Sequence, residues 1–590
     1  MKNQSQSDRL SWGDTVFLHL EREGMPLNVA SICVFEGEIS FQDCVRFIES
    51  KLPLLPRYLK RVVSAPLGIG LPTWDYDPTF KVSRHLREVT LERGTNTELK
   101  TLAGTLFSTV MDRQHPLWDI TVVRGLRGPR TALIFRVHHC MCDGIAGVGI
   151  MNVLLDANPE VPRLPRKKLK LHVPRPADPL SSLTSGFVES YSDFVKRILS
   201  ALTDLLSMAE RAAANGTDLD TNEFVGLLPE IGAFTERLRF NVLYRGPQKF
   251  TFTDIPLADI KAIRHARGTS VNDVILAIVT ATIRRYCELH GDPVKGKLLR
   301  IMVPVNLRGS TTASELGNRI SLVPVTIPLD IRPPLKLLAA AHKRAEFLKH
   351  AHAAELVSLA GGLIGMFPIS AQGMVGSLLS RLPVSAFNLV CTNVPGPQLP
   401  LYLLGHKMLH CYPYVPVGGE MGLNCAILTY NGTAYFGFSG DVQAAPDLRK
   451  LENLLQESFI ELRDAAGIDA AGIKTPGKES EPRRQVVDAK TKLKTTAKKK
   501  TKPEIEKKTL RPTAHPVAPP VQSAPSPVPP PAQPKPAPEP APTIARKMTA
   551  EGEIATERRH ISKKQPAAPV IPIPPQPDFF LTLNNPLEVK

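Results

Sequence analysis

The chain has 590 residues, of which 43% are hydrophobic, so it is long enough for more than one domain with a sizeable core. Its 8 cysteines show no repeated CxxC spacing, which argues against a disulfide framework and fits a reducing cytoplasm. The N-terminus lacks a secretory hydrophobic region, and no run of about 20 residues is uninterruptedly apolar, so we expect no membrane-spanning helix.

The positive charge is concentrated near the C-terminus. Of the formal net charge of +17, +11 belongs to residues 474–590, which hold 22 Lys or Arg and 11 Asp or Glu. A lysine-rich run at 490–502 is followed by 14 prolines between Arg511 and Pro542. Such a composition cannot bury enough apolar surface to fold, so we predict a disordered tail over 471–590. The tail is either simply solvated or binds an anionic surface, and we favour lipid over nucleic acid as that surface.

In the first half, residues 1–160, strand patterns at 31–37 and 131–139 alternate with helix patterns at 41–52 and 147–157. A basic, proline-punctuated link follows at 161–176; its cations are Arg163, Arg166, Lys167, Lys168, Lys170 and Arg175. Apolar residues then repeat every three or four positions from Phe187 to Leu206, which predicts an amphipathic helix. We assign 161–247 to this link and to crossover helices.

The second half is predicted over 248–470. It starts with a strand at 249–256 and a helix that begins near Ser270, and its further strands are predicted at 298–307, 320–329, 387–394, 423–432 and 434–441. The glycine-rich apolar segment 356–382 is too interrupted to be a good membrane span. It is either an interfacial helix pair or a pair of buried helices packed through small residues. The pattern as a whole predicts a mixed α/β body in two halves.

The stretch RVHHCMCDG, 136–144, carries the strongest chemical signal. A strand delivers His138 and His139 to its end, and neighbouring residues of a strand point to opposite faces, so only one histidine can face a given cleft. Imidazole suits proton transfer near neutral pH. Asp143 could orient such a base or hold the turn, and Gly144 permits backbone angles that other residues avoid.

Three interpretations of this stretch remain open on the residues alone. The histidines could be structural residues at a strand end with an Asx turn. They could form a metal site with Cys140 and Cys142, although adjacent ligands rarely close a tetrahedral site and no second cluster supplies partners. They could provide a general base that acts on a bound hydroxyl or thiol, since we find no GxSxG and no protease-like cysteine signature.

Several motifs in order resemble one family. HHCMCDG, 138–144, is similar to HHxxxDG of acyltransferases with a chloramphenicol-acetyltransferase-like fold. The opening LSWGDTVFLHLEREGMPLNVASICVFEG, 10–37, resembles bacterial wax ester synthase/acyl-CoA:diacylglycerol acyltransferases. Further similar segments run to about residue 465; they are PLW at Pro116, Leu117 and Trp118, ND at Asn272 and Asp273, MVPVNLRG at 302–309, LGNRIS at 316–321, NVPGP at 393–397 and 423–441. The resemblance implies an α/β fold of two chloramphenicol-acetyltransferase-like halves with a tunnel between them.

The resemblance also implies a reaction and its residues. His139 would be the general base that activates a fatty alcohol or the free hydroxyl of a diacylglycerol, which then attacks a long-chain acyl-CoA without an acyl-enzyme. His138 would support the strand end, and Asp143 would hold the loop. Asn272 would donate to the developing oxyanion, although SVNDVILA also fits a helix start with Asn272 as its N-cap.

The same resemblance gives substrate-binding roles to Gly144 and Asp273, and places Pro116–Trp118 along the substrate channel unless they are simply core. Residues 393–396 form a turn by composition. Cys140 and Cys142 would narrow the pocket or make it sensitive to oxidation. We expect no metal and no cofactor, since acyl-CoA is a substrate.

Two rival functions stay open. One keeps the fold and chemistry but changes the acceptor to a sterol, glycolipid or polyketide alcohol. The other is a non-catalytic protein that tethers lipid bodies or membranes, and a metal hydrolase is more remote. We expect a cytoplasmic protein that lies peripherally on the inner membrane face or on lipid inclusions, held there by its basic segments.

Overall fold

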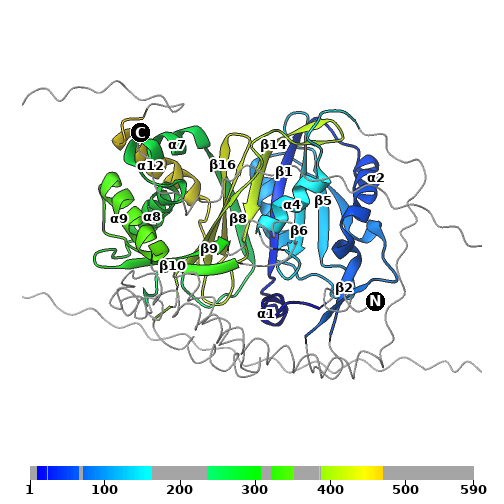
Figure 1. Cartoon of the computed structure of the whole chain (residues 1–590), viewed down its shortest axis with the longest axis horizontal. Coiled ribbons are helices and arrows are strands. Elements are labelled where there is room, and N and C mark those ends of the chain that lie inside the picture. The colour runs from blue at the N-terminus through cyan, green and yellow to red at the C-terminus, as the bar shows by residue number, and fades with distance from the viewer. Residues whose placement is uncertain are drawn as a thin grey trace, which may run out of the picture. The chain divides into compact units, whose positions relative to one another are not determined.

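The computed structural model of the chain describes residues 9–22, 24–64, 71–142, 144–161, 235–306, 320–350, 384–385 and 387–468. They belong to one compact unit that spans Met1–Glu481 and contains two six-stranded sheets with their helices (Figure 1). Several sequence predictions lie outside the described residues: Asp143, the basic link beyond residue 161, the helix at 187–206, the LGNRIS segment up to residue 319, the segment 356–382 and the tail from 471.

The first sheet has the strand order β13-β14-β1-β6-β5-β4. Its strands are β1 (Asn28–Glu36), β4 (Leu86–Thr90), β5 (Trp118–Arg124), β6 (Arg130–His138), β13 (Tyr402–Leu403) and β14 (His406–Tyr414). The helices of this half are α1 (Trp12–Leu20), α2 (Phe41–Lys51), α3 (Asn96–Phe107) and α4 (Gly144–Leu154), and 3-10 turns form at Leu52–Leu54, Pro56–Leu59 and Val82–Arg84. A separate hairpin joins β2 (Lys60–Val63) to β3 (Thr73–Tyr76).

The second sheet has the order β10-β9-β12-β15-β16-β8. Its strands are β8 (Gln248–Pro256), β9 (Leu298–Asn306), β10 (Ile320–Pro328), β12 (Leu389–Pro395), β15 (Leu423–Tyr430) and β16 (Thr433–Asp441). Its helices are α7 (Leu257–Arg267), α8 (Val271–Leu289), α9 (Pro334–His350) and α12 (Lys450–Ala465), and β7 (Thr235–Glu236) pairs with β11 (Val384–Ser385).

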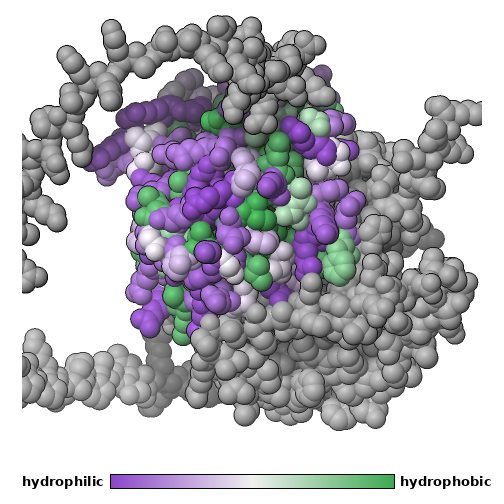
Figure 2. All heavy atoms as spheres, turned by 90° about the vertical axis from the view of Figure 1, so that its left-hand side faces the viewer, coloured by the Kyte–Doolittle hydropathy of each residue, from purple (hydrophilic) through white to green (hydrophobic). Residues whose placement is uncertain are grey.

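The apolar patterns explain these positions. Every residue of β15 is buried, as expected for a strand covered on both faces. Helix α8 is buried almost all round, because α9 and α12 pack against it. Seen end-on, the outer face of this half is mostly hydrophilic in its described part, with apolar side chains in small groups (Figure 2). The helices of the second half therefore bury their apolar faces inward.

The two halves are interleaved. β13 and β14 lie late in the chain, yet β14 pairs antiparallel with β1 and completes the first sheet, with Cys411 opposite Cys33. On the other side of the seam, α3 packs against β8 so closely that a Cβ on Gly104 would lie 3.0 Å from the Gln248 carbonyl oxygen. The Lys100 ammonium of α3 is 2.7 Å from a Glu452 carboxylate oxygen of α12. The halves therefore form a single body rather than two separable domains.

The mixed α/β pattern in two halves is confirmed by the structure, and all predicted elements among the described residues are present. The predicted helix at 147–157 begins three residues earlier, at Gly144. The expected turn at Asn393 is wrong, because Asn393 lies within β12, which ends at Pro395. The sequence patterns did not reveal β14 or its place in the first sheet.

Candidate active site

The end of β6 separates the two histidines. The His138 amide donates to the Leu117 carbonyl and the His139 amide donates to the Leu27 carbonyl, each at 2.9 Å. These two backbone bonds fix the strand end from both flanks. Because alternate residues face opposite ways, the two imidazoles enter different surroundings.

The His138 ring is a fully buried structural group. Its Nδ1 accepts a hydrogen bond from the Cys140 amide at 3.1 Å. Its Nε2 lies 3.3 Å from a Glu21 carboxylate oxygen. Since Nδ1 accepts, the hydrogen of the neutral ring belongs on Nε2, facing the carboxylate. Both nitrogens of the His138 ring therefore face polar groups of the protein, the Cys140 amide and the Glu21 carboxylate. Support of the strand end by His138 stays a prediction.

Glu21 follows α1 and connects it to the histidine strand. Its side chain is fully buried and also accepts from the Leu27 amide at 3.1 Å and from the Arg113 guanidinium at 3.2 Å. Burial alone would raise the pKa of this carboxyl. The hydrogen bonds from His138, Leu27 and Arg113 outweigh burial, so the pKa lies below its ordinary value of 4.5. Glu21 is therefore an ionised anchor beneath the site.

The His139 ring is only half-buried. It stacks on the Phe17 ring of α1, with the centroids 4.0 Å apart and the planes 9° from parallel. Helix α1 starts with Ser11 as its N-cap, whose hydroxyl accepts from the Asp14 amide at 3.0 Å. Phe17 thus holds the imidazole plane while Glu21 holds the helix that carries Phe17.

The loop after the histidines contains several predicted site residues. Asp143 lies outside the described residues. Cys140 and Cys142 are buried, and burial raises the pKa of the Cys140 thiol well above its ordinary value. A buried thiol that stays protonated is a poor nucleophile, which argues against oxidation at Cys140. Narrowing of the pocket by the two cysteines stays a prediction.

Gly144 opens α4 at a point where the two halves touch. A Cβ at this position would lie 2.7 Å from Cγ2 of Val394 in β12. Glycine is therefore required here for close approach. The substrate-binding role predicted for Gly144 stays a prediction, but the residue brings the histidine loop against the NVPGP strand.

The PLW segment has the contacts of core residues. Pro116, Leu117 and Trp118 are all buried. The Trp118 indole N–H donates to the Tyr58 carbonyl at 2.8 Å, and its ring stacks on His85 at 4.4 Å. Because the Leu117 carbonyl also accepts the hydrogen bond from the His138 amide, the segment supports the end of β6. Its lining of a substrate channel stays a prediction.

The ND motif forms the first turn of α8. Ser270, not Asn272, is the N-cap; its hydroxyl accepts from the Asp273 amide at 3.1 Å, and its amide donates to the Asp273 carboxylate at 2.8 Å. The interpretation of Asn272 as the N-cap is therefore wrong. Asp273 is buried within this capping box, so its contacts are those of a residue that fixes the turn around Asn272.

Asn272 is held by the NVPGP strand. Its side-chain oxygen accepts a hydrogen bond from the Asn393 amide group at 2.5 Å. With the oxygen engaged, the NH2 group of Asn272 remains as a donor, and it makes no hydrogen bond to a described residue. Val394, next to Asn393, contacts Gly144 in the other half. The strand β12 therefore links the amide of α8 to the histidine loop.

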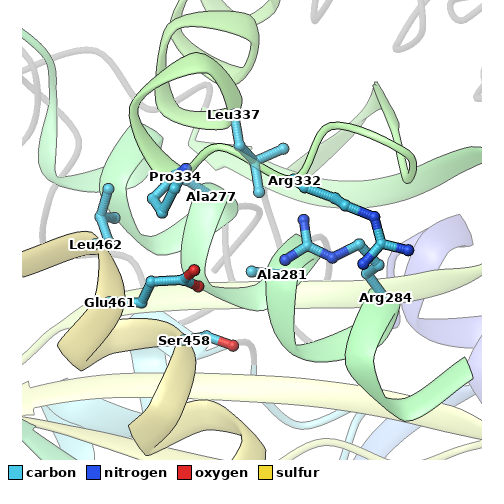
Figure 3. A pocket seen from close by; sticks show the side chains of 9 residues that line it. All are labelled: Ala277, Ala281, Arg284, Arg332, Pro334, Leu337, Ser458, Glu461 and Leu462. Carbon is cyan, nitrogen blue, oxygen red and sulfur yellow. The ribbon is translucent and has the colours of Figure 1, made fainter. Parts of the chain in front are cut away.

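A small open pocket of about 220 Å³ lies among α8, α9 and α12 (Figure 3). Arg284 and Arg332 stand on one side of it, and Glu461 and Ser458 on the other. That volume includes space open to solvent. Its lining residues on α8 start at Ala277, beyond the first turn that carries Asn272. We therefore do not assign the substrates to this pocket.

Two further features of the described residues concern metal binding and membrane spans. Across the described residues, no three or more His, Cys, Asp or Glu side chains are placed to hold a metal ion. No helix in the described part of the chain is long and apolar enough to cross a membrane.

Comparison with known proteins identifies the family. Residues 10–275 match the wax ester synthase/diacylglycerol acyltransferase catalytic domain, and residues 316–463 match the C-terminal domain of the same enzymes. The chain belongs to this family of acyltransferases. Both matched regions end before the basic tail, so the family resemblance covers the body alone.

Relatives and solved structures agree with this family. A probable diacylglycerol O-acyltransferase of Mycobacterium tuberculosis, tgs1, is 26% identical over 438 residues, covering 74% of this chain and 91% of the relative. A second one, tgs2, is 26% identical over 469 residues, covering 78% of this chain and 100% of the relative. The wax ester synthase/diacylglycerol acyltransferase of Marinobacter aquaeolei has a TM-score of 0.53 at 23% identity, covering 78% of this chain and 100% of that one.

A more distant likeness confirms the fold class. The first condensation domain of the calcium-dependent antibiotic synthetase has a TM-score of 0.50 at 15% identity, covering 78% of this chain and 96% of that one. The predicted two-half chloramphenicol-acetyltransferase-like fold is therefore confirmed for the wax ester synthase/diacylglycerol acyltransferase body.

Three residues of the site escaped the sequence analysis as functional groups. Phe17 and Glu21 lie in the opening segment, where nothing in the pattern connects them to the histidines more than a hundred residues later. Asn393 was assigned only to the end of a strand and to a turn. An acid in the opening segment and an asparagine two residues before a proline were weak signals, and only the fold brings them to the strand end and to Asn272.

Proposed function

We propose that the chain transfers a long-chain acyl group from acyl-CoA to the hydroxyl of a diacylglycerol or a fatty alcohol, and so forms triacylglycerol or wax ester. The observation that carries this proposal is the different surroundings of the two imidazoles at the end of β6. His138 is fully buried between the Cys140 amide and the Glu21 carboxylate, whereas His139 is half-buried and its ring stacks on Phe17. We assign the proton transfer to the second of these imidazoles, that of His139.

His139 acts as a general base on the acceptor hydroxyl. As the proton moves to the imidazole, the hydroxyl oxygen attacks the thioester carbonyl and the C–O bond forms. The tetrahedral intermediate then collapses, the C–S bond breaks, and CoA leaves with the proton from the imidazolium. The reaction needs only the two substrates and no cofactor. The protonated, buried Cys140 is unsuited to form an acyl-enzyme, which supports direct transfer.

Asn272 donates its NH2 group to the oxyanion of that intermediate. Its amide is oriented by Asn393, and the first turn of α8 is fixed by Ser270 and Asp273. A donor that is already oriented costs no reorganisation during the reaction, and one such donor contributes about 3–4 kcal/mol.

The chain also works at a lipid surface, since its acceptors are lipids. Support comes from the cations of residues 161–176 and from the charge of +11 beyond residue 473. Near an anionic leaflet each cation adds roughly 1 kcal/mol of attraction.

The transfer is tested by release of free CoA thiol from palmitoyl-CoA with diolein or with hexadecanol. We expect acceptor-dependent release by the full chain and a fall of at least about a hundredfold in His139→Ala, in line with the contribution of a general base. His265→Ala, an exposed histidine on α7, is the matched control and should keep full activity. Acceptor-dependent release that persists undiminished in His139→Ala would overturn the proposal.

A further inference from the structure

A histidine of α9 contacts the ND turn, which is the first turn of α8. His342 lies in α9, and its Nδ1 is 2.7 Å from a carboxylate oxygen of Asp273 in α8. The histidine side chain is 30% exposed and the aspartate side chain 1% exposed. The other ring nitrogen, Nε2, lies 3.6 Å from the Glu346 carboxylate one turn further along α9. The imidazole thus stands between two acids, one of them buried.

Asp273 depends on this contact. The carboxylate oxygen that meets His342 also accepts the Ser270 amide, so one atom serves both the helix cap and the pair between α8 and α9. The second carboxylate oxygen is buried without a hydrogen-bond partner among the described residues. A buried carboxylate is costly unless it is paired, and His342 is its only side-chain partner in the described part of the chain.

The residue next to Asp273 is Asn272, whose oxygen is held by Asn393. If the Asp273 carboxylate loses its partner, it is drawn toward water and loosens its bond to the Ser270 amide. The first turn of α8 then shifts, and the Asn272 NH2 group moves with it. A displacement of about 1 Å at a reacting centre can cost a hundredfold in rate.

We propose that His342 is a positioning residue for the acyl transfer, acting through Asp273 to hold the Asn272 amide in place. This inference rests on the proposed function of Asn272 as oxyanion donor. It assigns a role in the reaction to α9, a helix that carries none of the motif residues.

The other end of α8 supplies a matched control. There the C-cap residue His290 lies 3.1 Å from the Asp447 carboxylate, and its side chain is 18% exposed. Each pair of a histidine and an acid thus lies at one end of α8, the His342–Asp273 pair at its start and the His290–Asp447 pair at its end. Only His342 adjoins the turn that contains Asn272, so loss of a stabilising pair can be separated from loss of positioning.

The test measures kcat and KM of the full chain, with palmitoyl-CoA and diolein, for three variants. His342→Leu should lower kcat by about ten- to hundredfold at unchanged KM, because the donor acts in the transition state. His342→Asn should recover most of the activity, since its amide nitrogen can take the place of Nδ1. His290→Leu should keep the wild-type kcat even if its melting temperature falls. A wild-type kcat in His342→Leu, or equal losses in both leucine variants, would overturn the proposal.

A double-mutant cycle with Asn272→Ala separates this proposal from the proposed function. If His342 acts through Asn272, His342→Leu should cost almost nothing further in the Asn272→Ala background. Additive losses would refute the positioning role while leaving the acyl transfer intact. Inactivity of the wild-type chain would instead refute the function itself. If His342→Leu does not fold, Asp273→Asn gives the second route, because it keeps an oxygen for Ser270 and removes the charge that faces His342.

Discussion

At the scale of single residues, the candidate site depends on a buried carboxylate that touches no substrate in the proposed reaction. Glu21 joins α1, the histidine strand and the loop of Arg113. Its anchoring of α1 matters for catalysis because Phe17, four residues earlier, holds the plane of the His139 ring. The position of the base is thus set by residues on both sides of it.

Glu21→Gln should destabilise the protein by about 1–3 kcal/mol at pH 7, the range for a lost hydrogen bond to a charged group. The folded-state pKa of Glu21 lies below its ordinary 4.5, so the ionised side chain contributes its stability above that value. This contribution disappears as the pH falls through the folded pKa. Thermal unfolding at pH 7 and pH 4 should therefore show a smaller gap between wild type and variant at pH 4.

Glu457→Gln, an exposed acid of α12, is the control and should unfold like the wild type at both values. A gap that widened on acidification would show that the Glu21 carboxyl is neutral in the folded protein.

Sequence reasoning reached the residues whose chemistry is local to a motif. The resemblance that rests on HHxxxDG implied His139 as the base, and the ND motif implied Asn272 as a donor; both roles stay predictions. It could not find Glu21, Asn393 or His342, because their partners lie far away along the chain and no local periodicity encodes such contacts. The cap of α8 is different: the contacts between Ser270 and Asp273 span only three residues, so this local signal was present in the sequence and was misassigned to Asn272.

At the scale of elements, α4 and β12 meet where the histidine loop approaches the NVPGP strand. The contact depends on Gly144, whose missing Cβ leaves room for Val394. Asn393, the residue before Val394, carries the hydrogen bond to Asn272. Movement of this strand should therefore be transmitted to the proposed oxyanion donor.

Gly144→Ala should lower kcat/KM by roughly tenfold, since forcing a methyl group into a filled contact costs about 1–3 kcal/mol. Gly147→Ala is the matched control within the same helix, because a Cβ there meets nothing within 4 Å, and it should be neutral or stabilising. Steady-state kinetics of both variants check the prediction. The double variant with Val394→Ala should regain activity, and failure to do so would place the effect of Gly144→Ala elsewhere.

Alternation and helical spacing are local signals, and they predicted helix α8, all six strands of the second sheet, and β1 and β6 of the first sheet. The other four strands of the first sheet were not predicted. β14 has a strand-like sequence, but its partner β1 lies more than 370 residues earlier, and pairing at that distance leaves no trace in a single sequence. The separation into halves at 160 and 248 was drawn from the order of elements along the chain. In space, however, β13 and β14 of the second half belong to the sheet of the first half.

At the scale of the whole molecule, the family match ends at residue 463 and the compact body ends at Glu481. Most of the net positive charge of the chain lies after Glu481. Chemistry and surface attachment are therefore assigned to different parts of the chain. The body holds the proposed catalytic residues, and the segment after Glu481 supplies most of the excess cations.

A chain that ends after Glu481 should keep the melting temperature and the kcat of the full chain with a detergent-dispersed acceptor. Its affinity for vesicles of phosphatidylcholine with phosphatidylserine should fall by at least about tenfold at low salt, since each lost cation removes roughly 1 kcal/mol of attraction. Co-sedimentation with these vesicles measures the difference, and 0.5 M salt should remove it because the screening length shortens to a few ångströms. Pure phosphatidylcholine vesicles are the control and should not distinguish the two chains. Equal binding to the anionic vesicles would assign attachment to the body, whose own basic link at 161–176 would then be the next segment to neutralise.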